Sequence, residues 1–186
     1  MGALLNAYFT YAKSPAQALG SLIHERRFDA ALWGYVAAAL CWVVFFWTGD
    51  SLSAWGLLWR LVFFFLLEIT VGYVWAALSG LFLNFFSNSN GSSALFVVLG
   101  LSGFVQGLVL SFALIATALP WLKPLSALVF VITLILRFVF IVVNTSRVAD
   151  VKRGKAFCIL CFAMIPASAI GLLLLLAPIL LLSLLV

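Results

Sequence analysis

Charged side chains are scarce in this sequence. Asp, Glu, Lys and Arg together make up 8% of its 186 residues, whereas about a quarter of the residues of a typical soluble domain are charged. Hydrophobic residues make up 67% of the chain, and its mean hydropathy is +1.30. This shortage of charge excludes a water-soluble globular domain for most of the chain, so the sequence predicts an integral membrane protein with one membrane domain.

Cysteine and histidine are also rare, which excludes several kinds of site. The chain has three cysteines and a single histidine, His24. Three cysteines do not make a disulfide framework, and His24 is far in sequence from the cysteine pair that a zinc site would need. A Ser/His/carboxylate triad and a Gly-rich phosphate loop are both missing. We therefore expect no enzyme, no metal and no cofactor.

The pair Cys158-Ile159-Leu160-Cys161 leaves one alternative open, a membrane thiol oxidoreductase. Such enzymes carry a CxxC motif in a helix. Here the pair comes directly after a basic loop that we place in the reducing cytoplasm, and no second cysteine pair is present to relay electrons. Free cysteines of this kind usually behave as small hydrophobic residues, so this reading ranks third.

Long apolar runs dominate the chain, and each is about as long as the ~20 residues that span a bilayer as a helix, or longer. The fold class we predict is all-α: a polytopic membrane protein with five transmembrane helices. The last run is longer than one bilayer thickness and should tilt or kink, for example at Pro166 or Pro178. The five expected spans are 30–48, 61–86, 94–119, 125–144 and 157–186.

Residues 1–29 form the other expected unit, an N-terminal segment with an amphipathic helix. Ser14-Pro15-Ala16-Gln17 has the pattern of a helix start, with a capping serine and a proline at the first helical position. The helix that follows presents apolar residues on one face, and Arg26 and Arg27 come just before the first span. This pattern favours a helix lying on the membrane surface, where the arginines meet anionic lipid head groups. The alternative is a short connector helix.

The basic residues are concentrated in two places. Three of the ten Lys and Arg lie in residues 1–29 and four in residues 147–155. This distribution follows the positive-inside rule and is not the footprint of a nucleic-acid-binding protein. It places the N-terminus in the cytoplasm and, with five spans, the C-terminus outside.

Tryptophans mark the opposite interface. We expect Trp42 and Trp47 at the outer end of the first span, because indole rings favour the head-group level. Residues 53–59 are expected as an interfacial turn before the second span, with Trp55, Trp59 and Arg60 anchoring it there.

Small residues recur at four-residue spacing on three of the spans, a pattern that lets helix backbones approach closely in lipid. We predict that the stripes of the second and third spans pack against each other as a hairpin. The alternative is association with another membrane protein or with a second copy of the chain. Membrane lipids are expected partners in either case. The stripes are Gly72, Ala76 and Gly80; Gly103, Gly107 and Ser111; and Ala163, Ala167 and Gly171.

Polar residues within the spans are the candidate site: Glu68, Asn84, Gln106 and Arg137. Such residues are costly in lipid and are a functional hypothesis by default. Counted along their helices, Arg137 lies ~10 Å and Glu68 ~27 Å from the cytoplasmic face. We therefore expect no direct contact between these two charges. Arg137 is expected to face the bundle interior, bonded to Gln106 and Asn84, or to snorkel to the cytoplasmic head groups.

The expected partner of Glu68 is different. The position of Glu68 in its span favours a place near the outer interface, with Arg60 as its partner. Two roles remain open for the intramembrane polar residues, a structural network or a part in transport or lipid handling.

The order of segments resembles the bacterial branch of the Yip1 family. A short N-terminal segment with a proline precedes five spans, and a basic glycine-lysine-alanine turn precedes the last one. The Asp-Leu-Tyr-Gly-Pro motif of the eukaryotic members is absent. The matching stretches are 14–19 (SPAQAL), 91–102 (GSSALFVVLGLS) and 148–157 (VADVKRGKAF).

This resemblance implies a non-enzymatic multi-pass protein of the bacterial inner membrane, with a membrane-organising or partner-binding role. The alternative is a small transporter or lipid-handling protein that uses Glu68, Gln106 and Arg137.

Overall fold

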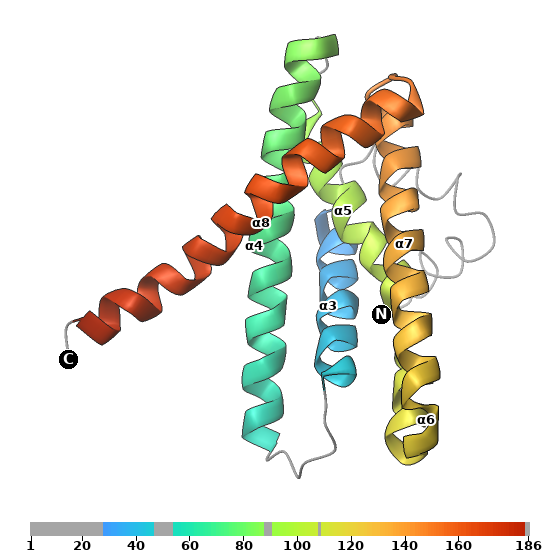
Figure 1. The fold of residues 1–186 in the computed structure, drawn as a ribbon. Coiled ribbons are helices and arrows are strands. Elements are labelled where there is room, and N and C mark those ends of the chain that lie inside the picture. The colour runs from blue at the N-terminus through green and yellow to red at the C-terminus, as the bar shows by residue number, and fades with distance from the viewer. Residues whose placement is uncertain (1–27, 47–53, 88–90, 108, 185–186) are drawn as a thin grey trace.

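The computed structural model describes residues 28–46, 54–87, 91–107 and 109–184 (Figure 1). The expected N-terminal surface helix and Trp47 lie outside these residues. The described part is all-helical and contains no strand. Its elements are α3 (Phe28–Phe45), α4 (Ala54–Ser87), α5 (Ser92–Gly107), α6 (Val109–Ala118), the short 3-10 helix η1 (Pro120–Leu122), α7 (Lys123–Val148) and α8 (Arg153–Leu184).

The predicted all-α fold with five membrane spans is confirmed. Within the described residues, five helical stretches are long and apolar enough to cross a membrane. The connections alternate between the two ends of the bundle. The last turn of α4, the first turn of α5 and the α7–α8 turn lie at one end, and the last turn of α3, the first turn of α4 and the α6–α7 turn lie at the other (Figure 1). We call the first of these the basic end, after the side chains described below.

One boundary differs from the sequence prediction. Residues 54–59, expected as part of an interfacial turn, instead begin α4, which is 34 residues long. The expected third span falls on α5 and α6, and the described residues from Ser92 to Ser111 are apolar enough for one membrane span.

The small-residue stripe of α5 packs against α3 and not, as predicted, against the stripe of α4. A Cβ atom added to Gly100 would lie 2.6 Å from the carbonyl oxygen of Ala31, and one added to Gly103 would overlap the carbonyl of Gly34. The sequence reading overlooked α3 because alanines dominate its small-residue face. The backbones of α3 and α5 therefore meet directly, as small residues permit in lipid.

The stripe of α4 faces α3 at Gly72 and α5 at Gly80, where an added Cβ atom would lie 2.7 Å from the side chain of Ser92. A Cβ atom on Gly72 would lie 2.8 Å from the Tyr35 ring of α3, and one on Gly171 of α8 would lie 2.7 Å from Val71. Helices α4 and α5 therefore pack together at Gly80, as expected of a hairpin, but the prediction that their small-residue stripes face each other is wrong. At Gly72 the side chain of Tyr35 fills the space, so α3 packs there and the stripe of α5 does not.

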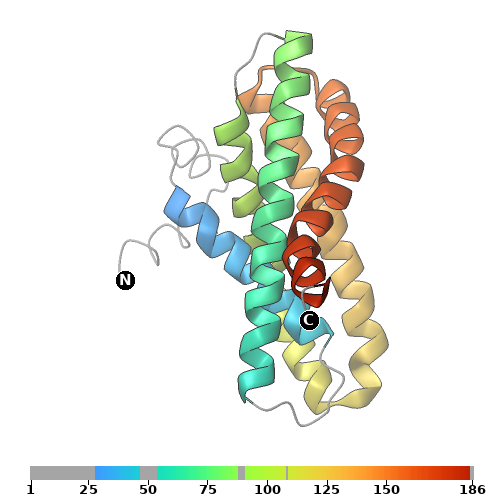
Figure 2. The ribbon, with the colours of Figure 1, turned by 90° about the vertical axis from the view of Figure 1, so that its left-hand side faces the viewer.

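Helix α8 crosses α4 at a steep angle and diverges from α7 along its length (Figure 1; Figure 2 shows the same crossing from the side). It leaves α7 after a tight turn in which Asp150 has a φ of 49°, a conformation that Asp tolerates better than most residues. The amide of Val151 closes this turn on the carbonyl of Ser146 at 3.0 Å. Helix α8 stays continuous through Pro166 and Pro178.

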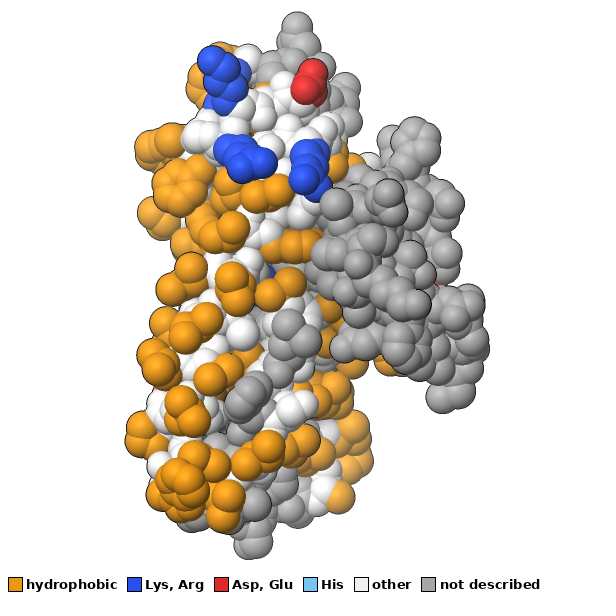
Figure 3. Space-filling model, turned by 90° about the vertical axis from the view of Figure 1, so that its right-hand side faces the viewer, with side chains coloured by type: hydrophobic (Ala, Val, Ile, Leu, Met, Phe, Trp, Pro, Cys, Tyr) orange, Lys and Arg blue, Asp and Glu red, His pale blue; other side chains and the backbone are white. Residues whose placement is uncertain are grey.

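The surface matches this arrangement. Basic side chains gather at the end that holds the α7–α8 turn, and apolar side chains cover the rest of the described face (Figure 3). The exposed basic residues of this end are Arg147, Lys152, Arg153 and Lys155. Lys155 also donates a hydrogen bond of 2.9 Å to the carbonyl of Phe86, near the end of α4.

The contact between α3 and α5 gives the first testable prediction. Gly103→Ala should lower the free energy of unfolding by about 1–3 kcal/mol, because the added methyl overpacks a site where two backbones meet. Thermal unfolding of the purified protein in detergent measures this.

Gly107→Ala, one turn along the same helix, is the matched control. Its added Cβ would lie 3.5 Å from Ala37, an ordinary contact, so its stability should stay within error of the parent. Equal stability of the two variants would contradict the close packing of α3 on α5.

Candidate functional site

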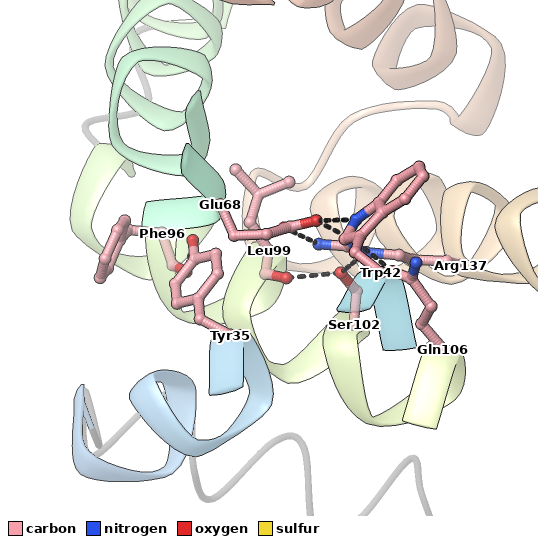
Figure 4. A network of polar contacts seen from close by, with 8 residues as sticks. All are labelled: Tyr35, Trp42, Glu68, Phe96, Leu99, Ser102, Gln106 and Arg137. Atoms are coloured by element: carbon pink, nitrogen blue, oxygen red, sulfur yellow. Dashed lines mark hydrogen bonds and ion pairs between the residues drawn. The ribbon is translucent and has the colours of Figure 1, made fainter. Parts of the chain in front are cut away.

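A salt bridge between Glu68 of α4 and Arg137 of α7 lies inside the bundle (Figure 4). The Nη2 of Arg137 lies 2.8 Å from Oε2 of Glu68, and Nη1 lies 3.1 Å from Oε1. The guanidinium therefore holds both carboxylate oxygens, the two-bond geometry that makes such pairs specific. Our expectation of no direct contact was wrong.

The error came from measuring depth along helices of unequal length. Helix α4 has 34 residues, so it is ~51 Å long and exceeds the ~30 Å hydrocarbon core of a bilayer. Its last turns extend beyond the other helices at the basic end (Figure 1). A residue count from its end thus overstates the depth of Glu68. Arg60, the partner expected for Glu68, is exposed.

Two residues of α5 hold Arg137 from the other side. Its Nε donates to Oγ of Ser102 at 3.1 Å, and its Nη1 donates to Oε1 of Gln106. Ser102 and Gln106 are both fully buried. The structure therefore brings three of the four candidate residues together, with Arg137 facing the bundle interior.

Helix α3 completes the network. The indole Nε1 of Trp42 donates to Oε1 of Glu68 at 2.7 Å, so this ring does not act as the interface anchor that its sequence position indicated. Helix α3 has 18 residues and stops short of the beginning of α4 (Figure 1), so Trp42 lies inside the bundle. Four helices thus meet at one ion pair.

Asn84 is not part of the network. It lies on an exposed face of α4, four turns beyond Glu68, and our expectation that it bonds Arg137 was wrong. The long projection of α4 past the basic end explains its exposure.

The cysteines have separate positions. Cys41 is buried, and its thiol donates to the backbone carbonyl of Gln106 at 3.0 Å. Cys158 is exposed and Cys161 is half-buried, and both are free thiols. Among the described residues no three His, Cys, Asp or Glu side chains cluster as metal ligands would.

A cavity of about 790 Å³ lies beside the ion pair, bounded by parts of α3, α4, α5, α7 and α8. Its volume falls within the roughly 300–1,000 Å³ of pockets that bind small molecules. Glu68 and Arg137 are its charged wall residues. Both keep a small exposed side-chain fraction, 14% and 12% respectively.

The rest of the wall is almost entirely apolar. Met164, Ser168 and Leu172 recur every four residues, so one face of α8 forms a wall of the cavity. Phe46 and Phe64 line it from α3 and α4. The divergence of α8 from α7 leaves this space, since two helices at a steep angle touch over a short length.

Aromatic side chains pack the α4–α7–α8 junction on the side of the basic end. The rings of Trp75 and Phe138 stack at 6.4 Å, and Phe157 meets Phe138 edge-on at 5.7 Å. The indole of Trp75 donates to the carbonyl of Leu160 at 3.0 Å. This cluster ties α8 to α4 and α7, and Trp75 and Phe138 also belong to the cavity wall.

Sequence reasoning missed three residues of the site: Tyr35, Trp42 and Ser102. Tyr35 is fully buried, lines the cavity and donates to the carbonyl of Phe96 at 3.2 Å. Tyr35 and Trp42 are seven residues apart and so share one face of α3. That spacing was a usable signal, because a buried indole or phenol needs a hydrogen-bond partner.

The ion pair gives a second prediction. Arg137→Met should cost about 3–5 kcal/mol of stability, because it leaves the Glu68 carboxylate buried without its partner. The double variant Glu68→Met/Arg137→Met should be more stable than Arg137→Met alone, because no unpaired charge remains. Unfolding in mixed micelles measures the parent, both single variants and the double variant.

In this double-mutant cycle, the coupling free energy isolates the pair from other effects of each change. Strictly additive losses would show that Glu68 and Arg137 do not interact in the folded protein.

The comparisons with known proteins return no match: no family model and no curated protein matches the chain, and no solved structure matches its fold.

Proposed function

We propose that this is a non-enzymatic multi-pass membrane protein that handles lipid-like molecules, binding an apolar chain in the cavity beside Glu68 and Arg137. The observation that carries the proposal is the cavity itself: about 790 Å³, with an almost wholly apolar wall and one ion pair. Such a wall suits a hydrocarbon chain, whereas a path for ions or small polar solutes would need polar groups along its length.

The chemistry of the network supports binding in preference to catalysis. The carboxylate and the guanidinium neutralise each other, and Trp42, Ser102 and Gln106 hold them in place. A carboxylate engaged in this way is a poor base or nucleophile. The pair instead fixes the relative positions of the four helices and gives an apolar cavity one polar spot, the usual design of a small-molecule site.

The basic end indicates how the bundle is oriented in the membrane. Four exposed Lys and Arg lie around the α7–α8 turn, and loops rich in these residues stay in the cytoplasm. We infer that this end is cytoplasmic and that the chain resides in the inner membrane of a bacterium, as the Yip1 resemblance implies. The membrane-organising role implied by the same resemblance is the second candidate. It is favoured by the same exposed basic residues, which would meet anionic lipid head groups.

A cavity-filling variant tests the lipid-binding function. Ser168→Phe places a ring in the cavity from α8 and should lower the amount of lipid that co-purifies with the protein at least several-fold. Mass spectrometry of lipid extracts from equal amounts of purified protein measures this.

Ile165→Phe is the matched control, because Ile165 lies on the same helix, is 72% exposed and is not part of the cavity wall. It should retain the parent's lipids. Unchanged lipid content in Ser168→Phe, with folding intact, would refute binding in this cavity.

A further inference from the structure

The hydrogen bonds of the ion pair specify what kind of polar group the cavity accepts. A carboxylate offers about four acceptor sites, and a guanidinium offers five N–H donors. Glu68 accepts three hydrogen bonds, two on Oε1 and one on Oε2. Arg137 uses Nε once, Nη1 twice and Nη2 once. One acceptor site on Oε2 and one donor on Nη2 are left over.

These two unused positions belong to atoms that are hydrogen-bonded to each other. Oε2 and Nη2 are the two ends of the 2.8 Å contact of the salt bridge, so a ligand group that binds beside this contact lies close to both. A hydroxyl oxygen is suited to this, since it donates one hydrogen bond and accepts two. An ether or ester oxygen only accepts, and an ammonium group only donates.

Charge balance selects against an ionic ligand. The pair is neutral as a whole, and the cavity wall beside it contains no further charged residue. A phosphate or ammonium group placed here would bring an uncompensated charge into an apolar site, which is strongly unfavourable. A neutral hydroxyl adds no charge.

Depth leads to the same selection. Arg137 is 14 residues after the first residue of α7 and 11 residues before its last, so the pair lies ~21 Å and ~17 Å from the two ends of this helix. A phospholipid whose charged head group stays at the interface cannot bring that group to the pair. A neutral lipid with a small polar end can.

We propose that the ligand of the cavity is a neutral amphiphile with a hydroxyl group, such as a long-chain alcohol, and not an anionic phospholipid. Its hydroxyl donates to Oε2 of Glu68 and accepts from Nη2 of Arg137, while its chain lies along the face of α8 formed by Met164, Ser168 and Leu172. This inference rests on the proposed function and adds the chemical class of the ligand.

Three probes with the same chain test it: palmityl alcohol, palmityl methyl ether and palmityl phosphate. Each is added to the purified protein at the same mole fraction in the detergent micelle, and native mass spectrometry measures the bound fraction. The Ser168→Phe variant supplies the background from binding outside the cavity. The alcohol should bind at least about tenfold more tightly than the ether, the gain expected from hydrogen bonds to charged groups. The phosphate should stay at background.

The outcomes separate the two proposals. Equal binding of alcohol and ether, or tightest binding of the phosphate, overturns the hydroxyl inference and leaves the lipid-binding function standing. Background binding of all three probes overturns both.

A variant that removes one charge of the pair adds a further test. Glu68→Gln leaves the Arg137 charge without its counter-ion, so the preference should shift towards the phosphate probe. An unchanged preference for the alcohol in folded Glu68→Gln protein also overturns the inference. If this variant does not fold, the three probes on the parent protein still decide the question.

Discussion

The salt bridge between Glu68 and Arg137 is the constraint on which the rest of the bundle depends. Neither charge is stable in an apolar interior alone, and each needs the other together with further hydrogen bonds. Those hydrogen bonds come from Trp42 of α3 and from Ser102 and Gln106 of α5. The four helices α3, α4, α5 and α7 therefore have to meet at one point, because any arrangement that separates them leaves a charge unpaired.

Close backbone contact between α3 and α5 also helps to bring the four helices to one point. Small residues of α3 and α5 bring these two helices together, so that Ser102 and Gln106 can reach Arg137 while Trp42 reaches Glu68. Hydrophobic burial cannot drive helix association in lipid, so tight packing and buried polar contacts have to do so. In this protein the two act at the same helices.

Helix α8 contributes in a different way. The aromatic cluster of Trp75, Phe138 and Phe157 fixes its first turns to α4 and α7, and beyond that cluster it diverges from α7 (Figure 1). The divergence creates an apolar cavity next to the bundle's buried ion pair. A structural requirement, the pairing of two charges, thus also supplies the polar spot that a ligand could recognise.

The sequence by itself determined the membrane class, the five spans and the chemical types of the intramembrane polar residues, because these follow from hydropathy, length and the cost of charge in lipid. It indicated Glu68, Gln106 and Arg137, yet it assigned Glu68 the wrong partner and added Asn84. Only the tertiary structure decided which residues meet, since depth depends on how far each helix projects and how it tilts. Hydropathy predicts neither the projection nor the tilt of a helix. It also does not predict the cavity, which arises from the angle between α7 and α8.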